Sequence, residues 1–300
     1  MKNTSTPIPS SYGNINKQAL IQFWVFYFSS FILHHLYSKF LLAQKYLSYY
    51  INASNGKGHG VHSPFVFDFI TKVLQDKNEY EHYALIEKLR QQLLRDNTIL
   101  EIEDFGAGSA VMKSNRRQVK AIAASSLKPK RFAQLLYRMV QYYKPATILE
   151  LGTSLGITSS YLARGNQHAT VYTCEGAAAI AAVAQKNFDT LQIKNISVIQ
   201  GDFAKTLQPL LQQAGKVDFA FIDGNHRKQP TLDYFTQLLQ YSNPSTILIF
   251  DDIHWSADME AAWAIIQQHP AVTLTIDLFF IGIVLLHPDF KVKQHFAIRF

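Results

Sequence analysis

The stretch Thr147–Gly156, TILELGTSLG, decides the fold of this chain. Its first half, Thr147–Leu151, is mostly apolar, carries one acid, Glu150, and predicts a short buried strand. Gly152 and Gly156 bracket the turn that follows, and helical spacing begins directly after it. Glycines let a ligand approach the backbone, and a helix start offers unpaired N–H groups, which is typical of a nucleotide-sized binding site. The same pattern also occurs in α/β proteins without a ligand.

A second acid favours the interpretation of this turn as a ligand-binding site. Another short strand is predicted at Thr170–Cys174, and Glu175 follows it, 23 residues after Gly152. An acid in this position can accept hydrogen bonds from the hydroxyls of a ribose. The turn lacks the G-x-G-x-x-G pattern of a dinucleotide site and offers little to a pyrophosphate. A ligand that carries an amino-acid group fits it better.

Here the chain resembles the class I S-adenosylmethionine-dependent methyltransferases. The resemblance covers about residues 126–300 and implies an α/β fold with a doubly wound, mostly parallel, seven-stranded Rossmann-like sheet. The matching segments are Glu150–Gly156 (ELGTSLG), Glu175, Gly201–Phe203 (GDF), Val217–His226 (VDFAFIDGNH) and Ile249–Trp255 (IFDDIHW).

Strands and helices alternate through this region, as a doubly wound fold requires. The last three strands have no helices between them, which indicates a parallel sheet closed by an antiparallel hairpin. The predicted strands are Thr147–Leu151, Thr170–Cys174, Ile196–Gln200, Val217–Ile222, Thr246–Phe250, Thr273–Leu278, Gly282–Leu286 and His295–Phe300. The predicted helices are Ile157–Arg164, Ala178–Leu191, Phe203–Ala214, Thr231–Tyr241 and Asp258–His269.

The resemblance implies a set of residues that bind S-adenosylmethionine. Glu150 and the turn at Gly152 would hold its amino-acid end, and Glu175 would hold its ribose. Asp202 and Phe203 would meet the edge and face of its adenine. The full expected set is Glu150, Gly152, Thr153, Ser154, Gly156, Glu175, Gly201, Asp202, Phe203 and Asp223.

Catechol-like and caffeoyl-CoA-like O-methyltransferases, which this half resembles most, hold a divalent metal. An Asp after the fourth strand and an Asp-Asn pair after the fifth bind it, which implies Asp223, Asp251 and Asp252 here. The pair is Asp-Asp in this chain, so the metal is a hypothesis. Carboxylate ligands would suit Mg²⁺, Mn²⁺ or Ca²⁺.

The expected catalytic residues are Asp223 and His226. The same families carry a lysine base three residues after the first metal-binding Asp, and this chain has His226 there. A histidine with an ordinary pKa near 6.5 is a reasonable base at neutral pH. The alternative is that His226 binds loop carbonyls. His254 and Trp255 follow the acid pair and could line the acceptor pocket.

The first 125 residues divide into two parts. Residues 1–57 form a tail and an apolar helix, with the run ALIQFWVFYFSSFIL at Ala19–Leu33. That run could pack on the domain or on a partner subunit, lie on a membrane surface through residues 19–50, or span a membrane. Residues 58–125 form a helical accessory region. Its basic segment continues to Arg131, with seven basic residues from Lys113 onward and no acid, and is either a solvated face or an anion-binding rim.

Composition limits the choice of function. With 48% hydrophobic residues, the 300-residue chain can bury a large core, and its single cysteine, Cys174, favours a reducing, cytoplasmic location. The net charge of +7 fits an anionic small molecule, a membrane surface or nucleic acid. Nucleic-acid methylation is disfavoured because no N-P-P-Y-type motif is present. The leading hypothesis is a small-molecule O-methyltransferase, and the alternative is a cofactor-binding module, attached to a membrane or partner, that does not catalyse. A homodimer fits either one.

Overall fold

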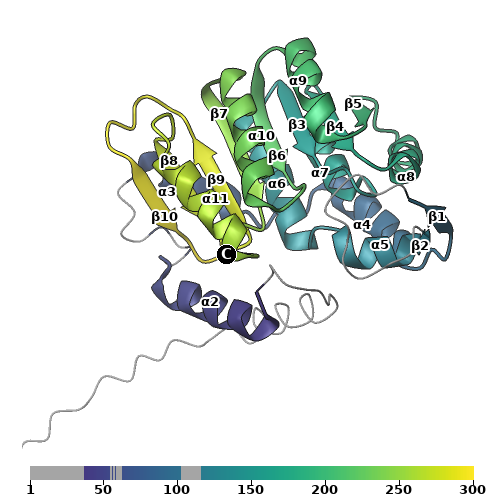
Figure 1. The fold of residues 1–300 in the computed structure, drawn as a ribbon, viewed down its shortest axis with the longest axis horizontal. Coiled ribbons are helices and arrows are strands. Elements are labelled where there is room, and N and C mark those ends of the chain that lie inside the picture. The colour runs from purple at the N-terminus through teal and green to yellow at the C-terminus, as the bar shows by residue number, and fades with distance from the viewer. Residues whose placement is uncertain (1–36, 55, 57, 59–62, 103–115) are drawn as a thin grey trace, which may run out of the picture.

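The computed structural model describes residues 37–54, 56, 58, 63–102 and 116–300, and most of them surround one large sheet (Figure 1). The strand order is β10-β8-β9-β7-β6-β3-β4-β5. The strands are β3 (Thr147–Leu151), β4 (Thr170–Glu175), β5 (Ile196–Gln200), β6 (Val217–Ile222), β7 (Ser242–Asp251), β8 (Leu274–Asp277), β9 (Ile281–Leu285) and β10 (Gln294–Ala297). The doubly wound, mostly parallel fold is confirmed, and β9, which is antiparallel to β7 and β8, supplies the expected hairpin.

The sheet has eight strands, one more than the seven that the resemblance implied, and each of the eight strands predicted from the sequence is present in it. β10 pairs in parallel with β8, from Gln294 opposite Leu274 to Ala297 opposite Asp277. β8 would otherwise be an edge strand with unpaired backbone groups, and β10 satisfies them. Because β10 is parallel to β8, the residues after Ala297 emerge at the edge where the other parallel strands end.

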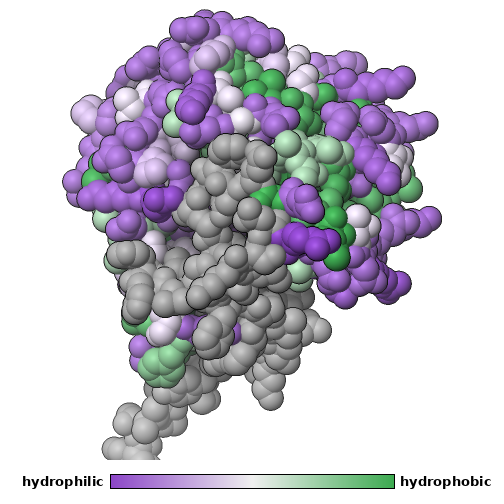
Figure 2. Space-filling view, turned by 45° about the vertical axis from the view of Figure 1, so that its right-hand side comes forward, coloured by the Kyte–Doolittle hydropathy of each residue, from purple (hydrophilic) through white to green (hydrophobic). Residues whose placement is uncertain are grey.

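Helices cover both faces of the sheet. They are α6 (Lys130–Tyr143), α7 (Ile157–Gly165), α8 (Ala178–Thr190), α9 (Phe203–Ala214), α10 (Lys228–Gln240) and α11 (Ala257–Gln268). Alternate strand residues face opposite sides. Ile148 therefore packs in a cluster with α6, α7 and α8, whereas Leu149 packs in a cluster with α9, α10 and α11. On the face shown in Figure 2, polar and charged residues cover most of the described surface, and a narrower band of apolar residues lies between them.

The accessory region packs against this domain. Tyr83 and Ile86 share a buried cluster with Tyr137 of α6 and Tyr161 of α7. The division at residues 57 and 125 stays a prediction. The elements are α3 (Pro64–Asp68), η1 (Phe69–Leu74, a π-helix), α4 (Glu81–Leu93), β1 (Ile99–Glu101), β2 (Arg116–Gln118) and α5 (Val119–Ser126).

The helix α2 (Lys39–Asn52) packs on the domain near the C-terminal end of the chain (Figure 1). Leu42 and Tyr46 are buried with Phe279. The apolar run that precedes α2 lies outside the described residues, so its membrane or partner contact stays a prediction. Among the described helices, none is long and apolar enough to cross a membrane.

Candidate active site

The turn after β3 lies directly against the end of β6. The Asp223 N–H donates to the Leu151 carbonyl at 2.8 Å. Gly152 has φ +105°, and a Cβ there would lie 2.1 Å from the Asp223 carbonyl oxygen. Only glycine fits both the left-handed backbone and the short separation. The turn therefore brings the start of α7 and the end of β6 together at one edge of the sheet.

Backbone bonds from β4 fix the turn. The N–H groups of Gly152 and Thr153 both donate to the Cys174 carbonyl at 3.0 Å. The Thr153 hydroxyl lies 2.6 Å from the Thr173 hydroxyl. At the other end of the turn, a Cβ on Gly156 would lie 2.7 Å from the Phe188 ring. The turn is thus held before any ligand arrives.

Glu150 is fully buried beneath this turn. The hydroxyls of Ser159 and Thr173 donate to its Oε2 atom, while Oε1 has no hydrogen-bond partner in the described part of the chain. Burial raises the pKa of Glu150 to about 8, although the two hydroxyls act in the opposite direction. A buried acid with one unpartnered oxygen suits a hydrogen-bond donor from a ligand.

Glu175, at the end of β4, is held at the turn by two backbone amides. Its Oε2 atom accepts from the Ser154 N–H at 2.8 Å, and its Oε1 atom accepts from the Ala177 N–H at 3.0 Å. Burial raises the pKa of Glu175, and these backbone bonds oppose the shift. The carboxylate therefore has a fixed orientation beside the turn.

The expected adenine residues lie at the next strand end and the start of α9. The Gly201 N–H, where φ is +136°, donates to the Glu175 carbonyl at 2.9 Å. Asp202 caps α9 by accepting from the Ala204 N–H at 3.0 Å. A Cβ on Gly224 would lie 2.6 Å from the Phe203 ring, so this ring borders the loop that follows β6.

Three potential metal ligands come together after β6 and β7. They are Asp223, His226 and Asp251, whose ligand atoms all lie within 4.8 Å of one another. The His226 Nε2 atom is 3.4 Å from the Asp223 Oδ1 atom. Asp252 is outside this group. It has φ +52°, and its N–H donates to the Phe280 carbonyl at 2.6 Å.

Lys128 completes the cluster, and sequence reasoning missed it. Its ammonium forms an ion pair with Asp251 and lies 3.8 Å from the Asp223 Oδ2 atom. Lys128 is 8% exposed and Asp251 1% exposed, so the pair is buried. Burial alone would lower the pKa of Lys128, but Asp223, Asp251 and Asp252 together raise it above its ordinary value. Lys128 therefore stays charged.

The same charges act on the other members of the cluster. Burial would raise the pKa of Asp223, but Lys128 and His226 hold it below its ordinary value. Burial would lower the pKa of His226, but its hydrogen bond with Asp223 and the charges of Asp252 and Asp223 raise it. The cluster thus combines an ionised acid, a fixed ammonium and a histidine with increased basicity.

This arrangement does not fit a divalent cation beside Lys128. A metal bound to Asp223 and Asp251 would lie next to the ammonium that already contacts Asp251. Two like charges at such a separation repel strongly in a buried site. The metal site predicted at Asp223, Asp251 and Asp252 therefore stays a prediction. It requires Lys128 to move away from Asp251.

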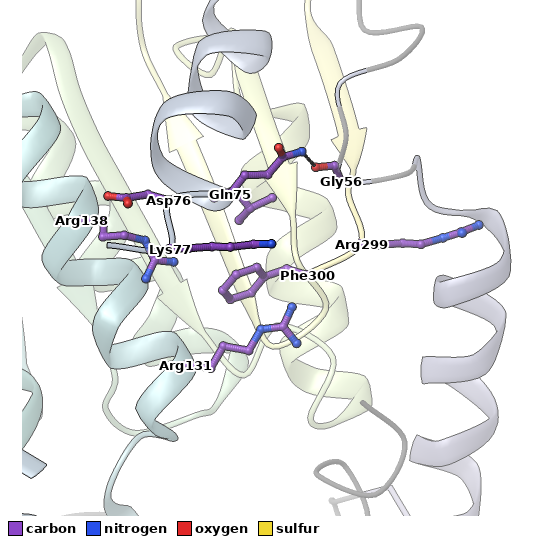
Figure 3. A pocket seen from close by; sticks show the side chains of 9 residues that line it. Gly56, Gln75, Asp76, Lys77, Arg131, Arg138, Arg299 and Phe300 are labelled. Atoms are coloured by element: carbon purple, nitrogen blue, oxygen red, sulfur yellow. Dashed lines mark hydrogen bonds between the residues drawn. The ribbon is translucent and has the colours of Figure 1, made fainter. Parts of the chain in front are cut away.

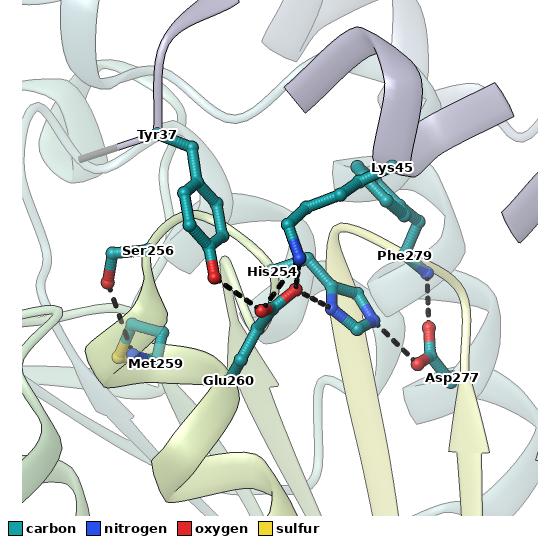
Figure 4. A network of polar contacts seen from close by, with 8 residues as sticks. All are labelled: Tyr37, Lys45, His254, Ser256, Met259, Glu260, Asp277 and Phe279. Carbon is teal, nitrogen blue, oxygen red and sulfur yellow. Dashed lines mark hydrogen bonds and ion pairs between the residues drawn. The ribbon is translucent and has the colours of Figure 1, made fainter. Parts of the chain in front are cut away.

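His254 and Trp255 lie beside α2 in the structure. His254 lies between two acids, with Nδ1 3.0 Å from Glu260 and Nε2 2.7 Å from Asp277 (Figure 4). Trp255 is partly buried against the α2 cluster, and its N–H donates to the Asp252 carbonyl at 2.9 Å.

The fold is the Rossmann-like fold of class I S-adenosylmethionine-dependent methyltransferases. Residues 149–253 match a family model described as a methyltransferase domain. This range includes the β3 turn, Glu175, the start of α9 and the Asp223–Asp251 cluster.

A curated relative is the catechol O-methyltransferase of Niastella koreensis, 29% identical over 163 residues, which are 53% of this chain and 72% of the relative. Among solved structures, the Podospora anserina methyltransferase PaMTH1, bound to S-adenosylhomocysteine, aligns with a TM-score of 0.52 and 12% identity over 86% of this chain and 99% of that chain. Cofactor-bound Rv0187 from MTB aligns with a TM-score of 0.50 and 15% identity over 71% and 92%. At these identities the two structures support the fold.

Proposed function

We propose that this methyltransferase transfers a methyl group to a hydroxyl oxygen of a small molecule. The observation that carries the proposal is the contact between the Gly152 turn and Asp223, which supports a role for the Asp223–His226 pair next to a cofactor bound at this turn. The relative from Niastella koreensis, named as a catechol O-methyltransferase, supports the same reaction class.

The site fits S-adenosylmethionine, which supplies an electrophilic methyl group on a sulfonium when it is bound. Glu150 and the Gly152–Gly156 turn would hold its amino-acid end, with Oε1 of Glu150 open to a hydrogen bond. Glu175 would hold the ribose hydroxyls. Gly201, Asp202 and Phe203 would border the adenine. These roles, including those of Thr153 and Ser154, are proposals.

His226 would accept the proton of the acceptor hydroxyl. Its raised pKa favours proton uptake, and Asp223 would stabilise the resulting imidazolium. Lys128 is charged and cannot serve as a base, but its ammonium could stabilise a nearby oxyanion. Bound S-adenosylmethionine would supply the methyl group to this oxygen, with S-adenosylhomocysteine as the leaving product. Correct alignment of the two reactants can contribute about 7–11 kcal/mol to lowering the barrier.

The test is methyl transfer by the purified full-length protein from labelled S-adenosylmethionine to catechol and other hydroxylated small molecules. Formation of a labelled methyl ether together with S-adenosylhomocysteine would support the function. If the folded protein binds S-adenosylhomocysteine but methylates no member of a broad hydroxyl panel, the non-catalytic module becomes the better explanation. Methylation confined to nitrogen or to nucleic acid would contradict the oxygen acceptor.

The cellular setting is a separate proposal. A single buried cysteine, Cys174, is compatible with a cytoplasmic protein. Residues 19–50 could bind a membrane surface or a second copy of the chain. Since α2 already packs on the domain, such a contact would involve mainly the residues that precede it.

A further inference from the structure

A basic pocket lies between the accessory region, α6 and the end of the chain. Its volume is about 340 Å³. Figure 3 shows Lys77 and Arg131 reaching toward the Phe300 ring, with Arg138 beside them on α6. The lining residues are Gly56, Leu74, Gln75, Asp76, Lys77, Arg131, Arg138, Arg299 and Phe300.

The arginines are held by carbonyls and rings rather than by acids. Arg138 is buried, and its Nε–H donates to the Val73 carbonyl at 2.8 Å. The Arg131 guanidinium lies 4.0 Å from the centre of the Phe300 ring. Arg299 directs its Nη2–H toward the Ile51 carbonyl at 3.0 Å, and its buried Nε has no partner within the described residues. Their positive charges are therefore not neutralised by these contacts.

The single acid in the pocket is already engaged. Asp76 accepts from the Asn78 N–H at 2.8 Å and from the Tyr80 hydroxyl at 2.6 Å. Across the described residues, none of the four basic lining side chains forms an ion pair. All acids of the chain except Glu103 and Asp104 lie in that described part. The side chains that line the pocket thus carry a clear excess of positive charge.

The pocket is close to the Asp223–Lys128 cluster. Lys128 and Arg131 are three residues apart, so their Cα atoms lie within roughly 11 Å of each other. Phe132 connects the two places, because its ring contacts both Phe300 and Phe280, at centroid distances of 5.3 and 5.5 Å. The Phe280 carbonyl in turn accepts from the Asp252 N–H. Phe300, Phe132 and Phe280 thus lie between the pocket and Asp252, so an acceptor held in the pocket would reach the proposed reaction site past these rings.

We propose that this pocket binds an anionic group, a carboxylate or a phosphate, of the methyl acceptor. Arginine guanidinium groups recognise both anions through paired N–H bonds, and a nearby lysine adds charge. The inference rests on the proposed function, since it assigns the acceptor class for that site. It also gives a role to part of the basic segment, which the sequence left open between a solvated face and an anion-binding rim.

Direct binding tests the pocket without turnover. Calorimetry with the full-length protein and inorganic phosphate at low ionic strength compares wild type with the double variant Lys77→Gln/Arg131→Gln. The matched control is Lys72→Gln/Lys130→Gln, which removes the same charge at exposed positions outside the pocket lining. The pocket variant should weaken phosphate binding at least fivefold, and the control less than twofold. Equal losses in both variants, or no binding by wild type, would overturn the site.

Turnover then identifies the source of the anion. The ratio of kcat/KM for a carboxylated catechol to kcat/KM for catechol should fall at least tenfold in the pocket variant and stay constant in the control. Thermal unfolding of each variant checks that it is folded. Phosphate binding that depends on the pocket, with an unchanged ratio, would show a separate anion ligand and overturn the acceptor assignment. Absence of any methyl transfer would contradict the proposed function, while the phosphate result would still report on the pocket.

Discussion

The ammonium of Lys128 contacts the carboxylate of Asp251 in the interior of the protein, among the acids that the sequence resemblance predicted as metal ligands. A buried ion pair adds little stability compared with apolar packing, but loss of one partner is costly. This pair therefore acts chiefly to fix the charge of the cluster. It also explains how three neighbouring acids, Asp223, Asp251 and Asp252, can be accommodated together.

Replacement of Lys128 should both destabilise the protein and create a cation site. Lys128→Met leaves Asp251 unpaired, so we expect a loss of about 3–5 kcal/mol in the free energy of unfolding. The variant should also gain Mn²⁺ binding, measured by calorimetry, while wild-type methyl transfer should be insensitive to a chelator. Lys130→Met, at an exposed position, is the control. Stoichiometric Mn²⁺ binding by the wild type would show that Lys128 leaves the cluster.

Glu175→Ala should weaken S-adenosylhomocysteine binding. The substitution strands the Ser154 and Ala177 N–H groups and removes the expected ribose acceptor, which typically costs about 1–3 kcal/mol. Calorimetry on the full-length protein gives the change in Kd. Glu79→Ala, at an exposed position, should leave Kd unchanged. An unaltered Kd for Glu175→Ala would remove this residue from the binding site.

His226→Ala should slow methyl transfer by roughly 10²–10⁴-fold with little change in S-adenosylhomocysteine affinity. A base acts in its neutral form, and the pKa of His226 is raised above 6.5. Wild-type kcat should therefore fall as the pH decreases through a value above 6.5, and the variant should lose this limb of the pH profile. His168→Ala provides an exposed histidine as control. If kcat of His226→Ala still falls as the pH decreases, another group accepts the proton of the acceptor hydroxyl.

Gly152→Ala should damage the turn itself. The new Cβ would meet the Asp223 carbonyl at 2.1 Å and would also require a left-handed alanine. Gly215→Ala separates these effects, because Gly215 has φ +70° but open space around it. We expect a loss of about 1–3 kcal/mol for Gly215→Ala, because φ +70° with ψ −118° is a sparsely populated conformation for residues other than glycine, and a larger loss for Gly152→Ala, measured by denaturant unfolding. Equal losses would mean that the backbone moves away from Asp223.

The α2 contact predicts a stability effect far from the proposed chemistry. Lys45 Nζ lies 3.0 Å from both carboxylate oxygens of Glu260, and the Tyr37 hydroxyl donates to the same carboxylate at 2.5 Å (Figure 4). Deletion of residues 1–50 would expose Phe279, so the truncated protein should melt at a lower temperature than the full chain. Lys45→Ala should cause a smaller decrease, since the ion pair is partly exposed. An unchanged melting temperature after truncation would show that α2 is independent of the domain.

Local patterns predicted most of the sheet. β3, β5 and β6 have the bounds expected from their apolar runs, and α9 begins at Phe203 because Asp202 caps it. β10 was harder to place in the sheet. Its partner is chosen by the free edge of β8, which depends on the whole fold rather than on the sequence of residues 294–297.

The site was predictable where it follows strand ends and hidden where it depends on distant contacts. Asp223 directly follows β6 and Asp251 is the last residue of β7, and parallel strands bring such residues to one edge. Lys128 gave no comparable signal, since it is one of seven basic residues in its segment. Its burial arises only when the segment before α6 meets the end of β7, where Lys128 contacts Asp251. The burial of Glu150 likewise depends on hydroxyls from α7 and β4.

The parallel pairing of β10 with β8 affects how the protein can be handled. It directs Arg299 and Phe300 to the wall of the basic pocket. A label or substitution on β10 that shifts this strand would therefore also shift part of the pocket wall, so variants of residues 294–297 should be assayed for phosphate binding as well as for folding.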